Sequence, residues 1–434
     1  MKKLFSWINF FGTIMIMVSI YLLSFVPISL DFLNVFGQIL DDYHVTDLVF
    51  TTLNKDKKSD STIVIVNIGS LDRVGMAEQI NQLNKAKPAV LALDIRLTKA
   101  KDNEVDSVLE AAFRNTKNLV LASELINLEK EESEKAKEEE DNDDDDQEIT
   151  FDSLKVPLKR FRQYAKTAFV NVITDDDTDF ETWRVAAIKE KYIQRKLKKL
   201  DSAQIKVKIA KIDLKEELDS VAYANIKTDS VEMSKWKYVP TYDTTLQQEL
   251  GLGIQMALFY DSTKTKKFLE RGNAYEEVNY LGNTEKFIYL DAEQVREGKF
   301  DPKLVAGKIV LMGYHGTDSS QKAAWDEDKY YSPMNPRQIG RTTPDMYGMI
   351  GHANIISMIL NETHIYEMED WQGFLFAIIV CYFNVSLFIY LKTTRIWIPW
   401  YEGVTKLIQL TEIAFFVYLT IFFFDSYNIK LDLS

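Results

Sequence analysis

The sequence contains a single cysteine, Cys381, among 434 residues. One cysteine excludes an internal disulfide framework and a metal site built from paired cysteines. A Walker-type glycine-lysine loop, a G-x-S-x-G nucleophile elbow and an H-E-x-x-H helix are also absent. Because no motif points to catalysis, we expect a protein that is not an enzyme and that holds neither a cofactor nor a metal.

A basic stripe of the kind that binds nucleic acid is missing too, so we expect no nucleic-acid partner. The net charge of -13 is concentrated in Glu129–Glu148, which holds 13 acidic residues and 3 lysines, whereas the remaining residues hold 52 acids and 49 basic residues. The segment has almost no apolar side chains to bury, and it lacks the glycine and spaced glutamate of an EF-hand loop. Residues 129–148 are therefore interpreted as a disordered acidic insertion.

Charge is scarce in three apolar stretches, which we predict to be transmembrane helices at 4–30, 373–391 and 407–424. A bilayer crossing needs about 20 apolar residues. A cleaved signal peptide is disfavoured for the first stretch because it is too long and offers no small-x-small cleavage site. Glu412, in the third, is interpreted as reaching toward the lipid headgroups rather than as a functional residue.

The basic residues near these stretches predict the orientation of the chain. Lys2 and Lys3 precede the first stretch, and Lys392, Arg395 and Lys406 lie between the other two. Positive charge favours the cytoplasmic side, so the amino terminus and the second loop are expected there. Residues 31–370 then form a domain on the outer side of the membrane.

The soluble part is best understood from Thr62 to Leu97, which reads as strand, helix, strand. The two strands, Thr62–Ile68 and Ala89–Ile95, are apolar runs that suit the middle of a sheet covered on both faces. The helix between them predicts that the two strands are parallel. Further strands are expected at 118–123, 168–173, 183–188, 277–281, 286–290 and 308–313, and helices at 105–114, 246–260 and 352–360. The runs at 168–173 and 183–188 resemble a hairpin. The fold class is thus α/β, with a mixed, largely parallel sheet and flanking helices.

A ligand site is predicted at the carboxyl edge of this sheet, where open α/β sheets bind ligands. Asn67, Asp94 and His315 each follow a predicted strand, and Asp328 and His352 are further candidates. Simpler roles stay open: Asp94 could cap the backbone amides of a neighbouring loop, and His352 could be a hydrogen-bonded structural histidine.

Taken in order, residues 40 to 425 resemble the CHASE type 2 family, the extracellular sensory domains of bacterial membrane receptors. The motifs are Asp47 with Phe50, the strands IVIVNI and AVLALDI, Asp175 to Arg184 in place of a D-x-D-G-x-x-R hairpin, Val278-Asn279-Tyr280 before Gly282, Lys308 to Gly313, Asp328 with Ser332 and Pro333, and Gly348 with His352-Ala353-Asn354. Between Asp175 and Arg184 the glycine of the family's hairpin motif is missing and the turn is longer. In the element Asp328, Ser332 and Pro333, which resembles the family's D-x-x-x-T-P motif, serine replaces threonine.

The resemblance implies a multi-pass protein of the bacterial cytoplasmic (inner) membrane with a periplasmic sensory domain. Family members usually carry a third helix after the sensor and then an output domain, whereas this sequence shows two helices and no output domain. The first hypothesis is therefore a sensory or ligand-binding protein that binds an unknown small ligand and signals through a membrane or envelope protein. The second is a non-signalling envelope scaffold or assembly protein. The third is a hydrolase or metal-dependent enzyme that uses Asp94, His315 and Asp318.

Overall fold

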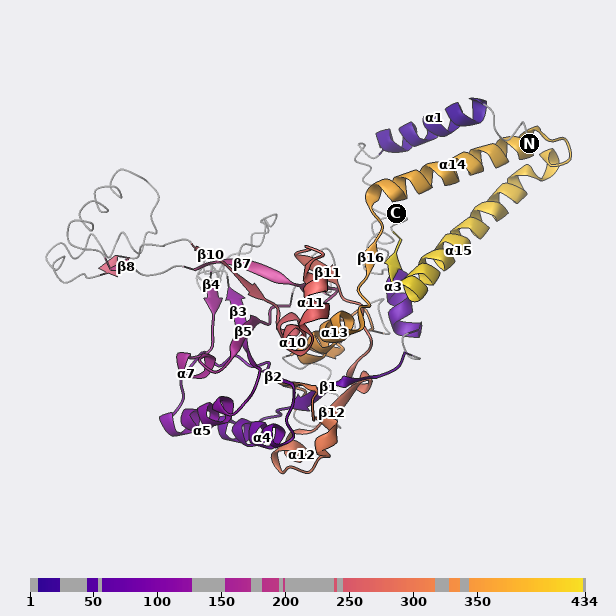
Figure 1. The fold of residues 1–434 in the computed structure, drawn as a ribbon. Coiled ribbons are helices and arrows are strands. Elements are labelled where there is room, and N and C mark those ends of the chain that lie inside the picture. Colours follow the sequence, from indigo (N-terminus) through magenta and orange to yellow (C-terminus); the bar gives the residue numbers. More distant parts are fainter. Residues whose placement is uncertain are drawn as a thin grey trace, which may run out of the picture.

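The structure is a computed structural model, and it describes residues 7–23, 45–53, 57–126, 153–172, 182–194, 198–199, 238–239, 245–316, 328–335 and 343–431. It contains an α/β body and a group of long apolar helices at one end of it (Figure 1). The acidic insertion at 129–148 lies outside the described residues.

The body is built on a sheet with the strand order β12-β1-β13-β2-β3-β4, and β5 pairs with β3 as well. All these pairs are parallel except β3 with β4. The strands are β1 (Asp60–Asn67), β2 (Val90–Leu93), β3 (Leu119–Ile126), β4 (Ser153–Lys155), β5 (Lys166–Phe169), β12 (Phe287–Leu290) and β13 (Ile309–Gly313). The predicted α/β class with a largely parallel sheet is confirmed.

Helices cover both faces of the sheet. They are α4 (Arg73–Lys85), α5 (Asn103–Arg114), α7 (Lys159–Arg162), α10 (Leu252–Tyr260), α11 (Ser262–Leu269), α12 (Ala292–Arg296) and α13 (Gly348–Asn361). Successive strand residues point to opposite faces. In β1, Val64 and Val66 therefore pack in the cluster with α4 and α5, whereas Ile63 and Ile65 pack in the cluster with α10 and α13.

Shorter elements complete the body. They are α3 (Val45–Leu48), the π-helical turn η1 (Val49–Leu53), the 3₁₀ turns η3 (Thr284–Lys286) and η4 (Pro302–Leu304), and strands β6 (Val185–Ala187), β7 (Lys189–Gln194), β8 (Lys198–Lys199), β9 (Tyr238–Val239), β10 (Thr245–Leu250), β11 (Tyr275–Glu277), β14 (Lys329–Tyr330) and β15 (Met346–Tyr347).

Three local predictions are wrong. The runs at 168–173 and 183–188 do not form a hairpin, because β5 joins β3 and β6 pairs with β11. The strand predicted at 277–281 is not found beyond Glu277, where β11 ends, whereas the one predicted at 286–290 is present as β12, which pairs with β1 in the main sheet. Residues 246–250 belong to a strand, β10, which is antiparallel to β7. In each case a partner distant in sequence decides the structure.

The apolar helices are α1 (Trp7–Leu23), α14 (Asp370–Thr393) and α15 (Tyr401–Tyr427). By length and composition, α14 and α15 could cross a membrane. The first predicted span is not confirmed, because α1 has 17 residues and falls short of the about 20 that a crossing needs. Residues 1–6 and 24–30 lie outside the described part. Two such helices are therefore found in the described chain, and not three.

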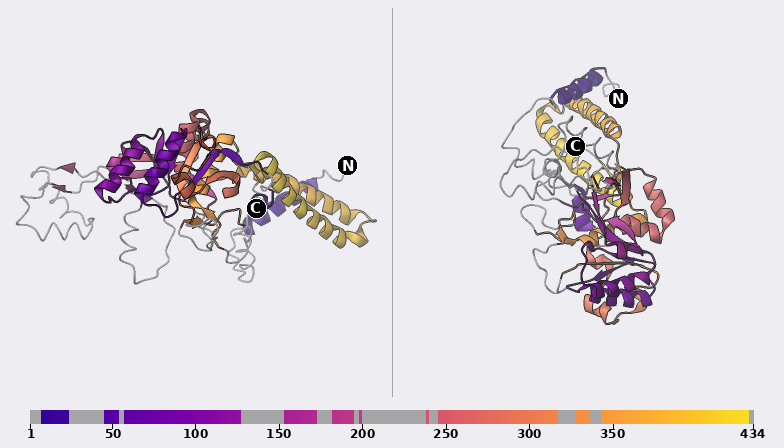
Figure 2. Two further views of the ribbon diagram at one scale, coloured as in Figure 1. Left: turned by 90° about the horizontal axis from the view of Figure 1, so that it is seen from below. Right: turned by 90° about the vertical axis from the view of Figure 1, so that its left-hand side faces the viewer.

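The three apolar helices lie together beyond the body. Helix α1 runs beside α14, where the Asn9 side-chain amide donates a hydrogen bond of 3.0 Å to Ser386 Oγ. Helices α14 and α15 form a hairpin around the turn η5 (Ile398–Trp400), and this turn is the end farthest from the body (Figures 1 and 2). Glu412 lies on α15, partly exposed. Its interpretation as a headgroup-facing residue stays a prediction.

Candidate functional site

The carboxyl ends of β1 and β13 meet at the predicted edge, and Asn67 connects them. Its side-chain oxygen accepts hydrogen bonds from the backbone N–H groups of Gly69 (2.9 Å) and His315 (3.0 Å), and its amide donates to the carbonyl of Gly316 (3.1 Å). Gly69 has φ of +53°, a left-handed conformation that suits glycine. Asn67 is buried, and its hydrogen-bonding capacity is used within the fold. It fixes two loops and is not directed at a ligand.

His315 is held in place on several sides. Its Nε2 lies 2.7 Å from Thr284 Oγ1, and its ring lies 4.4 Å from that of Tyr347 and 5.0 Å from that of Tyr289, centroid to centroid. The structure thus brings His315 to Asn67, as the sequence predicted. The surrounding rings fill the space on two sides of the imidazole.

Asp94 follows β2 at the same edge, and its surroundings raise its pKa to about 7. Burial is the larger cause, and the charge of Asp328 is the second, while Arg96 opposes both. Tyr330 is close enough for both carboxylates to act on it, and burial with these charges raises the pKa of its hydroxyl to about 12. Burial and the nearby charge of Asp328 thus keep Asp94 protonated to a higher pH than an exposed carboxyl.

The Asp94 carboxylate accepts no hydrogen bond from the described residues, so the predicted capping of backbone amides is not seen there. Only its backbone N–H is bonded, to the carbonyl of Met312 at 2.8 Å. The described residues also contain no group of three or more His, Cys, Asp or Glu side chains able to hold a metal ion. Asp318, the third member of the metal or acid/base hypothesis, lies outside the described residues.

His352 lies inside α13, and its ring and that of Tyr330 both pack against Trp183. Its ring packs edge-on against Trp183 with centroids 5.3 Å apart, and burial lowers its pKa to about 4. Its Nδ1 is buried without a hydrogen-bond partner in the described chain, which differs from the predicted hydrogen-bonded histidine. The neutral imidazole acts as a packing group in the core.

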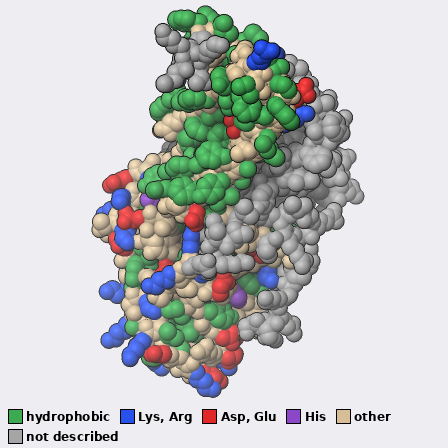
Figure 3. Space-filling model, turned by 90° about the vertical axis from the view of Figure 1, so that its right-hand side faces the viewer, with side chains coloured by type: hydrophobic (Ala, Val, Ile, Leu, Met, Phe, Trp, Pro, Cys, Tyr) green, Lys and Arg blue, Asp and Glu red, His purple; other side chains and the backbone are tan. Residues whose placement is uncertain are grey.

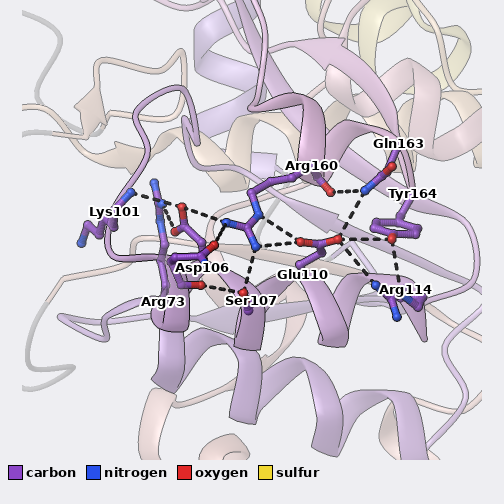
Figure 4. Close-up of polar contacts among 10 residues, drawn as sticks. Arg73, Lys101, Asp106, Ser107, Glu110, Arg114, Arg160, Gln163 and Tyr164 are labelled. Atoms are coloured by element: carbon purple, nitrogen blue, oxygen red, sulfur yellow. Dashed lines mark hydrogen bonds and ion pairs between the residues drawn. The ribbon is translucent and has the colours of Figure 1, made fainter.

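A second charged cluster joins α4, α5 and α7 (Figure 4). Arg73 forms a buried ion pair with Asp106, and Arg160 contacts the Glu110 carboxylate at 2.8 Å. Burial acts to raise the pKa of Asp106, but the hydrogen bonds from Arg73 and the Lys101 backbone, together with the charges of Arg73 and Arg160, outweigh it, so that the pKa is lowered overall. Each carboxylate is paired with arginine side chains, so this cluster fastens the helices together.

Two residues of the motifs that resemble the family, Asp47 and Arg184, form a buried ion pair elsewhere, at the junction with α15. Arg184 donates two hydrogen bonds to the Asp47 carboxylate, one of them at 2.8 Å, and both side chains are buried. The two residues are 137 positions apart, so no spacing rule connects them. Their membership of two motifs of the resemblance was the available signal, and the site prediction did not use it.

Other motif residues gather at the same junction. The Asn279 amide donates to the Thr363 carbonyl at 2.7 Å and to Asn428 Oδ1 at 2.9 Å, just after α15. The Asn354 side-chain oxygen accepts from the N–H groups of Leu281 (2.8 Å) and Gly282 (3.2 Å). Asn279 therefore holds the body to the end of α15, and Asn354 fixes the adjacent segment at 281–282. Of the predicted site, Asn67 with His315 and Asp94 with Asp328 are brought together, and His352 is not.

Comparison with known proteins agrees with the resemblance. No curated protein and no solved structure matches the chain. The pattern of the CHASE2 domain, however, matches residues 16–387, from within α1 to near the end of α14, which is most of the chain. Because this match covers most of the chain, the chain belongs to the CHASE2 family, a family of extracellular sensory domains.

Proposed function

We propose that this protein is a membrane-anchored sensor whose α/β body lies on the outer side of a bacterial cytoplasmic membrane, binds a small molecule without catalysing a reaction, and signals through a partner protein. Membership of a sensory family supports the sensing role. The two long apolar helices support the anchoring. The signalling role depends on how these helices are joined to the body.

The observation that carries the proposal is that the end of α15 is part of the body's core. Phe424 is 3% exposed and belongs to the same apolar cluster as α10 and α13. Its ring packs edge-on against Phe50, with centroids 5.4 Å apart. Closely packed interiors transmit displacement, so a change in the body would move α15.

A second attachment joins the two ends of the hairpin. Strand β16 (Tyr366–Glu367) precedes α14, strand β17 (Ile429–Lys430) follows α15, and the two strands are parallel partners. Lys430 forms an ion pair with Glu277, which belongs to β11 of the body. Both body-side ends of the hairpin are therefore fixed together, and the η5 end is left for contact with a partner.

The surface agrees with an anchored body. Figure 3 shows hydrophobic side chains gathered over the helices at one end of the molecule, whereas charged side chains lie over the body. On α14 and α15 many large apolar side chains are exposed, for example Phe374, Leu410 and Ile413. Exposed apolar surface of this extent is typical of a lipid-facing region.

Labelling single cysteines in intact cells tests the orientation. In a Cys381→Ser background, Lys101→Cys places a thiol on the body, and Arg395→Cys places one in the turn between α14 and α15. A membrane-impermeant maleimide should label the first in intact cells and the second only after the membrane is opened. The opposite pattern would overturn the proposed orientation. Labelling of both in intact cells would overturn it too, because the turn would then not be cytoplasmic.

A crosslinking experiment separates the sensor from the scaffold hypothesis. A photoreactive amino acid at Leu410, which is 66% exposed on α15, should give an adduct of defined mass with a second membrane protein in living cells. The same probe at Lys101 on the body is the comparison. An adduct from Lys101 alone would favour a scaffold that displays its outer domain, and would count against signalling through the helices.

A further inference from the structure

A cavity of about 520 Å³ lies where the body meets the end of α15. Its walls come from residues 57–62 at the start of β1, residues 279–281, the end of α13 with Thr363, and Asp425 with Asn428. This volume lies within the range of about 300 to 1,000 Å³ that is typical of small-molecule sites. The cavity is at the amino end of β1, and therefore at the end of the sheet opposite to the predicted site.

Much of the polar wall is already fixed by internal hydrogen bonds. Asp60 accepts hydrogen bonds from Ser357 Oγ (2.8 Å), Asn361 Nδ2 (3.2 Å) and the N–H of Thr62 (2.8 Å). The charge of Asp60 is thereby compensated without an ion pair. The wall is preorganised, and Asp60 is not the group that selects a ligand.

Two opposite charges on the lining remain without direct partners. In the described chain, neither the Lys57 ammonium nor the Asp425 carboxylate makes a hydrogen bond or an ion pair. Lys57 is half-buried: burial lowers its pKa, the charge of Asp425 acts in the opposite direction, and the charge of Lys286, whose ammonium donates to the Lys57 carbonyl at 2.6 Å, lowers it again. The two groups thus act on each other across the cavity, but they are not within the 4.0 Å of a salt bridge.

We propose that this cavity binds a small zwitterion, with its anionic group at Lys57 and its ammonium group at Asp425. A simple anion would meet the carboxylate of Asp425, and a simple cation would meet the ammonium of Lys57. A zwitterion compensates both charges at once. Lys58, exposed on the same lining, adds a second positive charge to the cavity wall, which suits a phosphate diester or a carboxylate as the anionic group.

This chemistry has two sources. One is the headgroup of a phosphatidylethanolamine molecule, since Asp425 lies in the last turn of an apolar helix at the body-side surface of the hairpin. The other is a free zwitterionic solute. This inference adds a ligand class to the proposed function. It rests on that function only for the claim that binding leads to signalling. Binding itself can be measured whichever way the chain faces.

Calorimetric titration of the full chain in phospholipid-free detergent tests the site. The probes are glycerophosphoethanolamine, a zwitterion, and its two halves, glycerol 3-phosphate and ethanolamine. We expect saturable binding of the zwitterion and at least tenfold weaker binding of each half. Equal binding of either half would overturn the zwitterion assignment. Absence of binding by all three would overturn the site. Neither result would bear on the cysteine labelling above.

Single charge-removing variants connect the binding to the two residues. Lys57→Met and Asp425→Asn should each weaken binding of glycerophosphoethanolamine at least tenfold, while Lys303→Met, which removes an exposed lysine from η4, should leave it unchanged. The doubly exchanged variant Lys57→Asp/Asp425→Lys should recover binding, because the zwitterion can bind in the reverse direction. Thermal unfolding of each variant shows that it is folded. Unchanged binding in both folded single variants would contradict the proposal.

Nanodiscs identify the source. If a lipid headgroup occupies the cavity, discs of phosphatidylethanolamine should compete and abolish binding of the soluble probe, whereas discs of phosphatidylglycerol should not. If the ligand is a free solute, the probe should bind equally in both. Either pattern supports a zwitterion site. Loss of binding in phosphatidylglycerol discs alone would contradict it, since that lipid has no ammonium group.

Discussion

The two ends of the central sheet differ in what they offer a ligand. At the carboxyl edge, Asn67, Thr284 and the rings around His315 fill the space with internal contacts. At the amino edge, the start of β1 lines a cavity that the end of α15 helps to close. The general rule for open α/β sheets places ligands at the first edge. In the described part of this chain the rule identifies residues that meet in space, whereas a cavity of about 520 Å³ lies at the other edge.

The largest expected effect concerns the Asp47–Arg184 ion pair at the junction with α15: removing one partner should strongly lower the free energy of unfolding. Asp47→Ala leaves the Arg184 guanidinium buried without its partner, and such changes cost about 3 to 5 kcal/mol. Chemical unfolding of the full chain in detergent measures the loss. Glu293→Ala, which removes an exposed ion pair with Arg296, is the matched control and should cost less than about 1 kcal/mol. Equal costs would mean that the junction adds little to stability.

The second prediction concerns the carboxyl edge and its dependence on pH. The pKa of Asp94 is about 7 in the folded protein, above the value of an unfolded chain. Between pH of about 4 and 7 the folded state thus binds more protons than the unfolded state, so that this group lowers stability as the pH rises. Asp94→Asn should stabilise the protein by on the order of 2 kcal/mol at pH 8 and change little at pH 4.

Unfolding of Asp94→Asn at several pH values checks this expectation. Asp102→Asn, at an exposed position before α5, serves as the control for the loss of one charge. A stabilisation that is the same at pH 4 and pH 8 would show that Asp94 is not the proton-holding group. A destabilisation at pH 8 would indicate that its charge is used by a partner.

The smallest expected effect concerns the fixed histidine. Thr284→Val removes the hydroxyl that lies 2.7 Å from His315 Nε2, and the loss of one neutral hydrogen bond costs about 1 kcal/mol. Thr393→Val, whose hydroxyl bonds to a carbonyl of its own helix, gives the corresponding control on α14. A loss of several kcal/mol from Thr284→Val would make the carboxyl edge as important to stability as the junction.

The central strands of the sheet could be predicted because each is marked by a short apolar run in its own segment of the sequence. The runs that form β1, β2, β3 and β13 are apolar on both faces, and Pro88 ends the helix between the first two. The segment LQQEL at 246–250 misled because leucine, glutamine and glutamate favour a helix, whereas pairing with β7 overrides that preference. Gly251 separates this strand from α10, since a Cβ there would lie 2.8 Å from the carbonyl oxygen of Ala187.

The site was harder to predict than the fold for a physical reason. Strand ends identify which residues share an edge, as with Asn67 and His315, but they do not reveal whether side chains fill that edge. The cavity is lined by Lys57 and Asp425, which are far apart in sequence. They share one cavity because Phe424 anchors the end of α15 in the core. Periodicity within one segment carries no information about such a contact.

Hydrogen–deuterium exchange of Phe424→Ala in nanodiscs tests most directly whether the body and α15 share one core. Phe422→Ala, at a 40% exposed position on the same helix, is the control. Removing the buried ring should increase exchange in α15 and also in body segments 45–53 and 278–281, because Phe50 packs against this ring and Tyr280 packs against Phe50. An increase confined to α15 would contradict the account, since the helix would then be attached to the sensor but not packed into it.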